Sequence, residues 1–226
     1  MKIAITRLEN KAAGDRALCA TYGHDCYTVS PLRAELRPDR IDTFVEAVHR
    51  GEFDCLFFSS ALPAAVVGPK LERWPRVIAI GPRTAEVLRG FGIEAEVLPT
   101  FYSRDFAPYL GDWLRGRTVG IPRADVPNPG LLDAIAAAGG TVREERVYAL
   151  APTGAELTLD GADAVLFTSA MSYREARWRS RDDLLLVAIG EITADAMRAG
   201  GHPPAVVGDG SLAGTLETLN RHTGGR

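Results

Sequence analysis

The chain has 226 residues and a formal net charge of −3, with 46% hydrophobic and 24% charged residues. These values are typical of a globular protein with a real core, and the acidic balance argues against a broad nucleic-acid-binding surface, which needs an excess of Lys and Arg. No apolar run reaches the ~18 residues of a membrane-spanning helix, and the apolar start is too short for a signal peptide, so we expect a cytoplasmic protein without a membrane contact. The three cysteines form no CxxC pair and the four histidines are scattered, so we expect neither a structural zinc nor a disulfide framework.

Short apolar runs bounded by Gly, Pro or polar residues predict strands that alternate with helices along the whole chain. The expected strands are residues 2–6, 24–30, 53–59, 77–80, 94–98, 117–122, 141–149, 163–168 and 184–189. The expected helices are residues 10–22, 41–50, 63–71, 104–114, 131–138 and 212–219, with two more that begin near residues 84 and 193. The remaining segments are expected to be irregular: a crossing segment at 33–40, a loop at 123–130, a linker at 152–154 and a disordered tail at 223–226. This alternation predicts parallel α/β sheets with crossover helices.

One strand–glycine–helix segment occurs twice, because residues 79–89 return as residues 188–198. In each copy a buried strand ends at a glycine, a helix follows, and a second glycine (Gly92 or Gly201) closes the helix where positive φ is needed. The match keeps a constant offset from Asp54 and Asp163 onwards, and a fainter echo links residues 3–23 with 119–139. A duplicated α/β domain and two sheets explain this pattern, although the repeat leaves open which halves pack together.

The common nucleotide and nucleophile fingerprints are absent: there is no full GxGxxG, no Walker lysine motif and no GxSxG elbow. Ligands bind open α/β sheets at the carboxyl ends of the strands, and there the sequence places N–H, O–H and guanidinium donors, which suit carboxylates or phosphates. Each donor also has a local alternative, because the hydroxyls can cap helices and the arginines can be surface charges. The predicted anion-binding residues are Arg7, Ser59, Ser60, Gly81, Thr84, Ser103, Arg123, Thr168, Ser169, Gly190 and Thr193.

Tyr148 ends the last strand before the linker. A tyrosine at that place either packs between two lobes or, if it faces a cleft, donates its O–H to a leaving group. No carboxylate pair or metal-binding cluster stands out in the chain.

Taken together, these residues resemble the uroporphyrinogen-III synthase family over almost the whole chain. The resemblance is carried by the order and spacing of several short pieces rather than by any one of them. The pieces are Ile5-Thr-Arg7, Phe58-Ser-Ser60, Ile80-Gly-Pro-Arg-Thr-Ala85, Ile121-Pro-Arg123, Val147-Tyr148, Phe167-Thr-Ser169 and Ile189-Gly with Thr193-Ala194.

The resemblance implies two flavodoxin-like parallel-sheet lobes, one of them discontinuous, joined by a two-strand connection. Lobe 1 would comprise residues 1–32 and 153–226, and lobe 2 residues 33–152. The implied function is that of a cofactor-free, monomeric, cytoplasmic hydro-lyase of tetrapyrrole and haem biosynthesis. It would close hydroxymethylbilane to uroporphyrinogen III, with inversion of the last pyrrole ring and loss of water. Tyr148 would assist departure of the hydroxyl, and the other predicted residues would bind the carboxylates of the substrate.

One departure from the family pattern keeps a second interpretation open. The second motif contains Glu191 where the family more often has proline, which puts a negative charge beside a predicted anion site. This favours a non-catalytic two-lobed module that binds a tetrapyrrole or another anion, whereas Tyr148 and both Ser/Thr pairs favour the enzyme. A third interpretation, a transferase acting on a phosphorylated donor, lacks a phosphate-loop signature and metal-binding acids.

Overall fold

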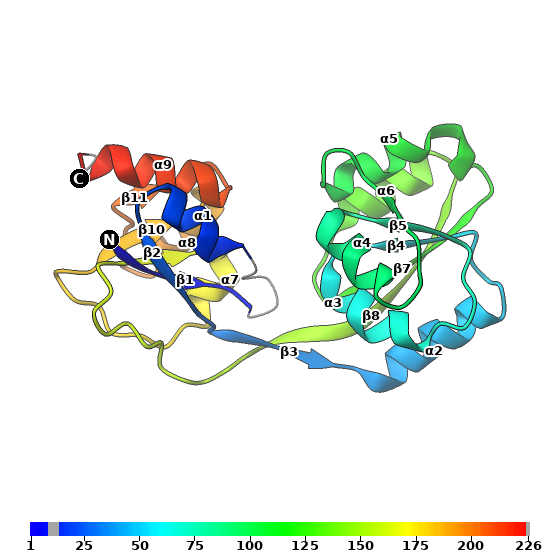
Figure 1. Ribbon diagram of the computed structural model, residues 1–226, viewed down its shortest axis with the longest axis horizontal. Helices are drawn as coiled ribbons and strands as arrows, with labels where there is room; N and C mark the ends of the chain where they lie inside the picture. Colours follow the sequence, from blue (N-terminus) through cyan, green and yellow to red (C-terminus); the bar gives the residue numbers. More distant parts are fainter. Residues whose placement is uncertain (9–13, 225–226) are drawn as a thin grey trace. The chain divides into compact units, whose positions relative to one another are not determined.

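The structure, a computed structural model, describes residues 1–8 and 14–224 and contains two α/β units (Figure 1). The first unit combines both ends of the chain, Met1–Ala34 and Ala151–Arg226, and the second comprises Glu35–Leu150. Each unit is built around its own sheet. Within the described residues, no helix combines the length and the apolar character that crossing a membrane requires.

The sheet of the first unit joins strands that are far apart in the sequence. Its strands lie in the order β11-β10-β9-β1-β2, and every neighbouring pair is parallel. The register sets Phe167 beside both Thr6 and Ala188, so three strands end side by side. The bounds are β1 (Lys2–Thr6), β2 (Asp25–Val29), β9 (Ala164–Phe167), β10 (Leu185–Ala188) and β11 (Val206–Val207).

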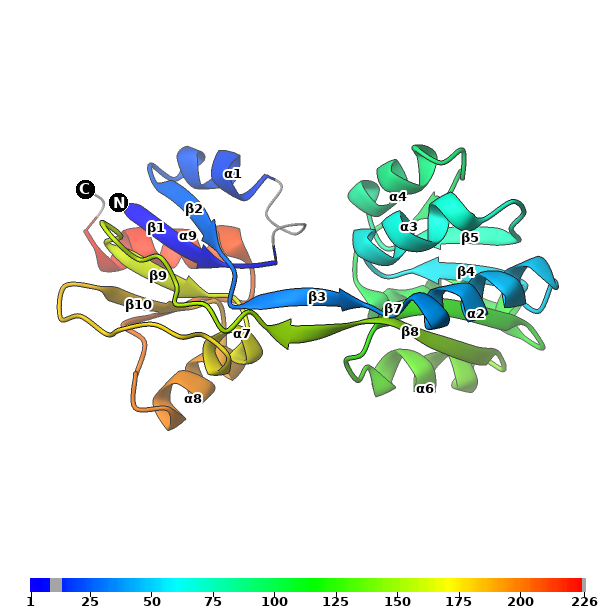
Figure 2. The same ribbon diagram turned by 90° about the horizontal axis from the view of Figure 1, so that it is seen from below.

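Helices cover both faces of this sheet (Figures 1 and 2). Because side chains alternate along a strand, Ile3 and Ile5 pack with α1 (Asp15–Thr21) and α9 (Leu212–His222) on one face. Ala4, Val165 and Phe167 face the opposite way. They pack with α7 (Ala170–Arg174) and α8 (Glu191–Ala199).

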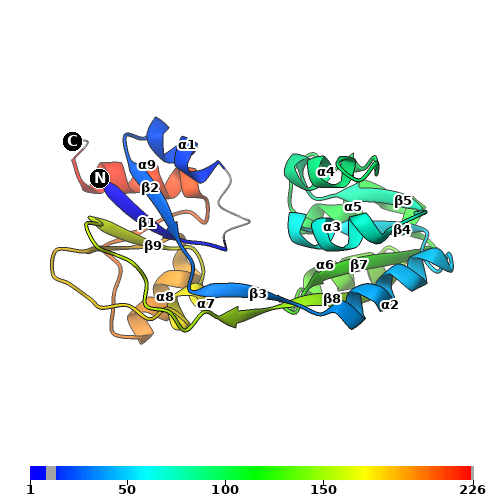
Figure 3. The ribbon, with the colours of Figure 1, turned by 60° about the horizontal axis from the view of Figure 1, so that its bottom comes forward.

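The second sheet has the order β3-β8-β7-β4-β5-β6, and Figure 3 shows β5, β4, β7 and β8 side by side. Cys55 and Phe57 face α5 and α6, where Phe57 stacks on Phe106 with ring centroids 4.2 Å apart. The strands are β3 (Leu32–Leu36), β4 (Cys55–Phe58), β5 (Arg76–Ala79), β6 (Glu96–Val97), β7 (Thr118–Ala124) and β8 (Thr141–Pro152). The helices are α2 (Pro38–His49), α3 (Ala61–Val67), α4 (Pro82–Arg89), α5 (Phe106–Leu110) and α6 (Pro129–Ala137), with 3-10 turns at Gly68–Lys70, Ser103–Asp105 and Gly111–Leu114.

Parallel alternation of strands and helices is confirmed, but the local pattern of residues 33–40 and 152–154 was interpreted wrongly as a crossing segment and a linker, whereas the family resemblance implied a two-strand connection. Residues 32–36 form strand β3, and β8 continues through Pro152 where a linker was expected. The Arg37 N–H donates to the Val147 carbonyl at 2.9 Å and the Thr153 N–H to the Pro31 carbonyl at 2.8 Å. From Pro31 to Arg37 the residue numbers rise, while those of their partners fall from Thr153 to Val147, so β3 and β8 run antiparallel. An antiparallel strand at the edge of a sheet can face water on one side, which suits the polar sequence of β3.

Three smaller differences concern helices and turns. The expected helix at 104–114 is broken at Gly111, whose φ of 52° interrupts it. The short strand β11 was not predicted, because two residues carry no periodicity. The expected helix start at residue 10 and the last part of the expected tail at 223–226 lie outside the described residues. The predicted helix-closing glycines are confirmed, since Gly92 and Gly201 have φ of 78° and 79°.

The cysteine expectation needs a correction, because Cys19 and Cys26 form a disulfide with Cα atoms 6.0 Å apart. Cys19 lies on α1 and Cys26 on β2, and both are buried where the helix packs on the strand. Sequence spacing alone does not show this contact, since it depends on how the helix sits on the sheet. Cys55 is free, and burial raises the pKa of its thiol to about 12.

Asp54 and Asp163 are the first matched pair of the internal repeat, and they have the same structural role in the two units. Asp54 accepts a hydrogen bond from the Thr118 backbone N–H at 2.8 Å, and Asp163 accepts one from the Lys2 N–H at 2.7 Å. Each carboxylate therefore secures the beginning of the neighbouring strand. In the case of Asp54, these hydrogen bonds lower the pKa below its ordinary value, with the Thr118 N–H as the main cause.

Candidate functional site

The strand ends of the first unit bring three predicted residues, Arg7, Thr168 and Ser169, into one corner. Thr168 is tied to β1, because its N–H donates to the Thr6 hydroxyl at 3.1 Å and its own hydroxyl donates to the Thr6 carbonyl. The single O–H of Thr6 lies within hydrogen-bonding distance of Leu166 O (3.2 Å) and Ser172 Oγ (3.1 Å). This network holds the turn after β9 in one conformation.

Ser169 shows the local alternative for a serine at a strand exit, because it caps α7. Its hydroxyl accepts the Ser172 N–H at 3.0 Å, and the Ser172 hydroxyl accepts the Ser169 N–H at 3.0 Å. This is a capping box, with a serine in place of the usual Glu or Gln. Ser169 remains half-buried at the strand end, so a ligand contact would have to share its hydroxyl with the cap.

Arg7 forms an ion pair with Asp15, with Nε and Oδ2 2.5 Å apart and side chains 23% and 14% exposed. Burial raises the pKa of the Asp15 carboxyl above its ordinary value, and the Arg7 guanidinium acts in the opposite direction. The guanidinium therefore lies at the predicted strand end but already has an anionic partner from α1.

The second copy of the repeated motif places Gly190 at the N-cap of α8 and buries Thr193 in its first turn. Gly190 is extended (φ −171°), a backbone conformation that any residue can adopt, and an added Cβ would lie in van der Waals contact with Gly210, 3.4 Å from its Cα. Glu191, the departure from the family pattern, is 64% exposed and its carboxylate lies 2.6 Å from Arg198 Nη1. Its charge is partly offset by Arg198 rather than left unopposed at the start of the helix.

In the second unit, Tyr148 and Ser60 meet at the beginning of α3. Tyr148 is 3% exposed and lies opposite Ala124 in the β7–β8 ladder. Burial raises the pKa of its hydroxyl above the ordinary 10, against smaller lowering effects of the Ser60 hydrogen bond and Arg123. Ser60 is the N-cap of α3 but makes no capping bond with its side chain, because the residue at the position of Ser172 is Pro63, which has no N–H. The Ser60 hydroxyl is thus left for Tyr148.

Arg123 is buried rather than presented at the surface. Its side chain is 9% exposed, and Nη1 lies 2.5 Å from Glu144 Oε1 while Nη2 donates to the Val126 carbonyl. The guanidinium fastens the turn after β7 to strand β8, close to Tyr148. Ser59 follows β4 and is half-buried.

The first copy of the motif lies beneath an aromatic residue that the sequence analysis did not select. Gly81 is the N-cap of α4, and an added Cβ would lie 3.5 Å from the Phe101 ring. Phe101 is 54% exposed and has φ of 60°, which is uncommon for a residue other than glycine. Phe101 could have been selected from the sequence as an aromatic residue in a loop at the carboxyl ends of the strands, where ligands bind. Thr84 is buried in the first turn of α4, and Ser103 accepts a hydrogen bond from Asn128 Nδ2 at 3.3 Å.

The structure therefore gathers the predicted residues into two groups, one per unit. Arg7, Thr168, Ser169, Gly190 and Thr193 belong to the first group, and Ser59, Ser60, Gly81, Thr84, Ser103, Arg123 and Tyr148 to the second. Among residues 1–8 and 14–224, no group of three or more His, Cys, Asp or Glu side chains is arranged to hold a metal. Fold and donors together define a class: a two-unit parallel α/β protein whose strand ends suit an anionic ligand.

Comparison with known proteins identifies the family. A sequence model of the family described as Uroporphyrinogen-III synthase HemD matches residues 16–211, so the chain belongs to the uroporphyrinogen-III synthase family, whose members are hydro-lyases of tetrapyrrole biosynthesis. A uroporphyrinogen-III synthetase structure from Helicobacter pylori is 16% identical, with 97% of this chain and 98% of that chain covered and a TM-score of 0.61. A mutant uroporphyrinogen III synthase from the extremely thermophilic bacterium Thermus thermophilus is 18% identical, with both chains covered to 100% and a TM-score of 0.51. At these identities the structures show a shared fold. No curated protein matched the chain.

The resemblance inferred from the sequence and the two-lobed α/β fold class are thereby confirmed. The individual site residues and the boundaries of the lobes at residues 32 and 153 stay predictions.

Proposed function

We propose that this chain closes linear hydroxymethylbilane to uroporphyrinogen III, with inversion of the last ring and loss of water. The family match over residues 16–211 is the observation that carries this proposal. The donor-rich strand ends support it, because the substrate carries eight carboxylates and each unit offers hydroxyls and helix N-terminal amides to bind them.

Tyr148 is the proposed catalytic residue. Its raised pKa keeps the phenol protonated at neutral pH, so that it can donate a hydrogen bond to the departing hydroxyl. Ser60 orients that phenol, since its hydroxyl is not used to cap α3. A side chain that is 3% exposed requires a local movement to reach the substrate.

The remaining predicted residues position the substrate, which is the larger part of the catalytic effect if the pyrrole chemistry is largely intrinsic. In the first turns of α4 and α8, the Thr84 N–H donates to the Gly81 carbonyl and the Thr193 N–H to the Gly190 carbonyl. The amides that would bind carboxylates are therefore those of Arg83, Glu191 and Ile192, together with the hydroxyls of Thr84 and Thr193. Arg7 would exchange Asp15 for a substrate carboxylate. Arg123 would act mainly by holding the turn beside Tyr148 in place.

A coupled assay tests the proposal: hydroxymethylbilane is generated in place, the products are oxidised, and the type I and type III isomers are separated. Type III product that depends on this protein is the expected result, whereas type I alone, from protein that is folded, would contradict it. Tyr148→Phe should lower the rate by roughly 100-fold, at the lower end of what a positioned acid contributes. Tyr109→Phe is the matched control, because Tyr109 is an exposed tyrosine of the same unit that bonds to Glu96.

Family membership also supports a cytoplasmic location and the use of the substrate alone, without a cofactor. The expected monomeric state can be checked by sedimentation of the purified protein.

A further inference from the structure

A cavity of about 860 Å³ lies within the first unit, on the α7–α8 face of its sheet. Its walls come from the segment that follows α7, the C-terminal end of α8 and the chain just after β8. None of the residues assigned above to the substrate lines it. Its volume is within the range of pockets that bind small organic ligands.

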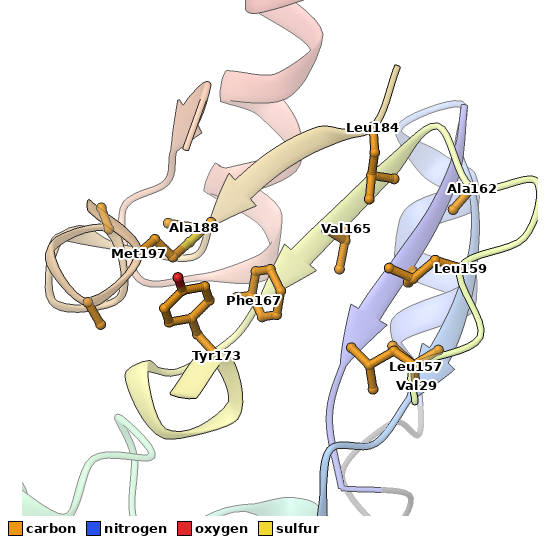
Figure 4. Close-up of a cluster of buried hydrophobic side chains, with 13 residues drawn as sticks. Val29, Leu157, Leu159, Ala162, Val165, Phe167, Tyr173, Leu184, Ala188 and Met197 are labelled. Atoms are coloured by element: carbon orange, nitrogen blue, oxygen red, sulfur yellow. The ribbon is translucent and has the colours of Figure 1, made fainter. Parts of the chain in front are cut away.

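One side of this cavity is a fixed aromatic wall. Figure 4 shows Tyr173 extending from α7 beside Phe167 and towards Met197 of α8. The Tyr173 hydroxyl lies 2.8 Å from His202 Nδ1, and the His202 ring is 4.9 Å from that of Trp178. Since Phe167 also contacts Trp178, with ring centroids 5.5 Å apart, the wall is anchored in the hydrophobic core.

The lining is also basic. Three arginines line the cavity, Arg174, Arg177 and Arg179, against a single acidic residue, Glu156. Glu156 pairs with Arg179 at 3.1 Å, whereas Arg174 and Arg177 have no ion pair within residues 1–8 and 14–224. The cavity therefore carries an excess of two positive charges in a chain whose net charge is −3.

The internal repeat places different residues at corresponding positions of the two units. The offset that carries Asp54 to Asp163 also carries Phe91 to Gly200 and Gly68 to Arg177. In the second unit Phe91 fills this place, since a Cβ on Gly68 would lie 2.8 Å from its ring. In the first unit Gly200 leaves room for the Tyr173 hydroxyl, which would lie 2.1 Å from an added Cβ. The second unit thus has an apolar ring at this place, and the first unit has the Tyr173 hydroxyl with Arg177 at the position that corresponds to Gly68.

We propose that this cavity binds a small organic anion with a flat conjugated ring. The ring would stack on Trp178, and its acidic groups would pair with Arg174 and Arg177, whose planar guanidinium groups match carboxylate or phosphate. Such a ligand can bear phosphate, as a mononucleotide does, or carboxylates, as an oxidised tetrapyrrole does. This inference is independent of the catalytic proposal, because it concerns different residues and a binding measurement.

Trp178 provides the readout. The chain has three tryptophans, and Trp74 and Trp113 both belong to the second unit, so Trp74→Phe/Trp113→Phe leaves Trp178 as the sole indole. The protein is titrated with AMP and, separately, with uroporphyrin III, and binding is followed by Trp178 quenching and by calorimetry. Saturable quenching by one probe is expected, and the probe that binds identifies the source of the acidic groups. Inorganic phosphate should not quench.

Arg174→Gln/Arg177→Gln should weaken this binding at least about tenfold, as expected for the loss of charge-assisted hydrogen bonds. Both arginines are exposed, so the variant should fold normally. Arg221→Gln is the matched control, an exposed arginine of the same unit on α9, and should bind like the parent. The proposal is overturned if neither probe quenches Trp178 or if inorganic phosphate quenches equally. It is also overturned if the glutamine pair leaves the affinity unchanged.

Discussion

Replacing Arg123 should lower the free energy of unfolding of the second unit. We expect this effect to be larger than any direct effect on substrate binding. The side chains of Arg123 and Glu144 are 9% and 16% exposed, so the pair is shielded from solvent. Removing one partner of such a pair costs about 3 to 5 kcal/mol, because the other charge is left buried. We expect the lower end, about 3 kcal/mol for Arg123→Met, because Arg146 lies 3.9 Å from Glu144 and compensates in part.

Urea unfolding followed by tryptophan fluorescence measures this loss. With Trp178→Phe as background, the remaining indoles, Trp74 and Trp113, lie in the second unit and report on it alone. Arg83→Met is the control, because Arg83 pairs with Glu86 at 2.7 Å where both side chains are 65% exposed. Such exposed pairs contribute about 0 to 1 kcal/mol.

A double variant separates the ion pair from other effects. Arg123→Met/Glu144→Leu removes both charges and should recover most of the lost stability, since an apolar pair is often as stable as a buried ion pair. If Arg123→Met lowers the free energy of unfolding by less than about 1 kcal/mol, the guanidinium is not a structural clamp. A raised KM with unchanged stability would instead support direct substrate contact.

Three further predictions follow from other parts of the structure. Phe101→Gly should change stability by less than about 1 kcal/mol, because relief of the positive φ offsets the lost ring contact, but should raise KM in the coupled assay; an unchanged KM would exclude Phe101 from the site. In oxidised, denatured protein a thiol reagent should detect one of the three cysteines, and reduction of Cys19–Cys26 should cost about 2 kcal/mol; three reactive thiols before reduction would contradict the disulfide. Asp54→Asn should lose stability near pH 7 but little near pH 3. The lowered pKa of Asp54 makes its contribution complete above the ordinary value of about 3.9 and lost as pH falls, so equal losses at both pH values would refute its role as a carboxylate.

The amino-acid sequence predicted most of the strands because parallel strands are buried on both faces and appear as continuous apolar runs, as in Cys55–Phe58. The local residue pattern failed at β3, where the alternation of Arg33, Glu35 and apolar residues at a sheet edge resembled an irregular segment, and only the family resemblance implied a strand there. The pairing of β1 with β9 came only from the family resemblance, since strand order depends on contacts that no local pattern records.

The site residues show a similar division. The sequence placed hydroxyls at the strand ends but did not distinguish Ser60 from Ser169, although Pro63 and Ser172 three residues later decide which of them caps its helix. The engagement of Arg7 by Asp15 and of Arg123 by Glu144 could not be predicted, because each ion pair joins elements whose packing is fixed only in three dimensions.

The order in which the chain is synthesised has a consequence for the first unit. Thr6 on β1 bonds to Leu166 on β9 across 160 residues, so at 5–20 residues per second β1 waits roughly 8 to 30 s on the ribosome for its neighbour. Glu35–Leu150 is complete by then and can already have folded. The nascent first unit thus exposes Ile3 and Ile5 until the C-terminal strands and α9 emerge. A chain that stopped just after residue 150 would contain the whole second unit, but its first unit would lack β9, the strand that pairs with β1.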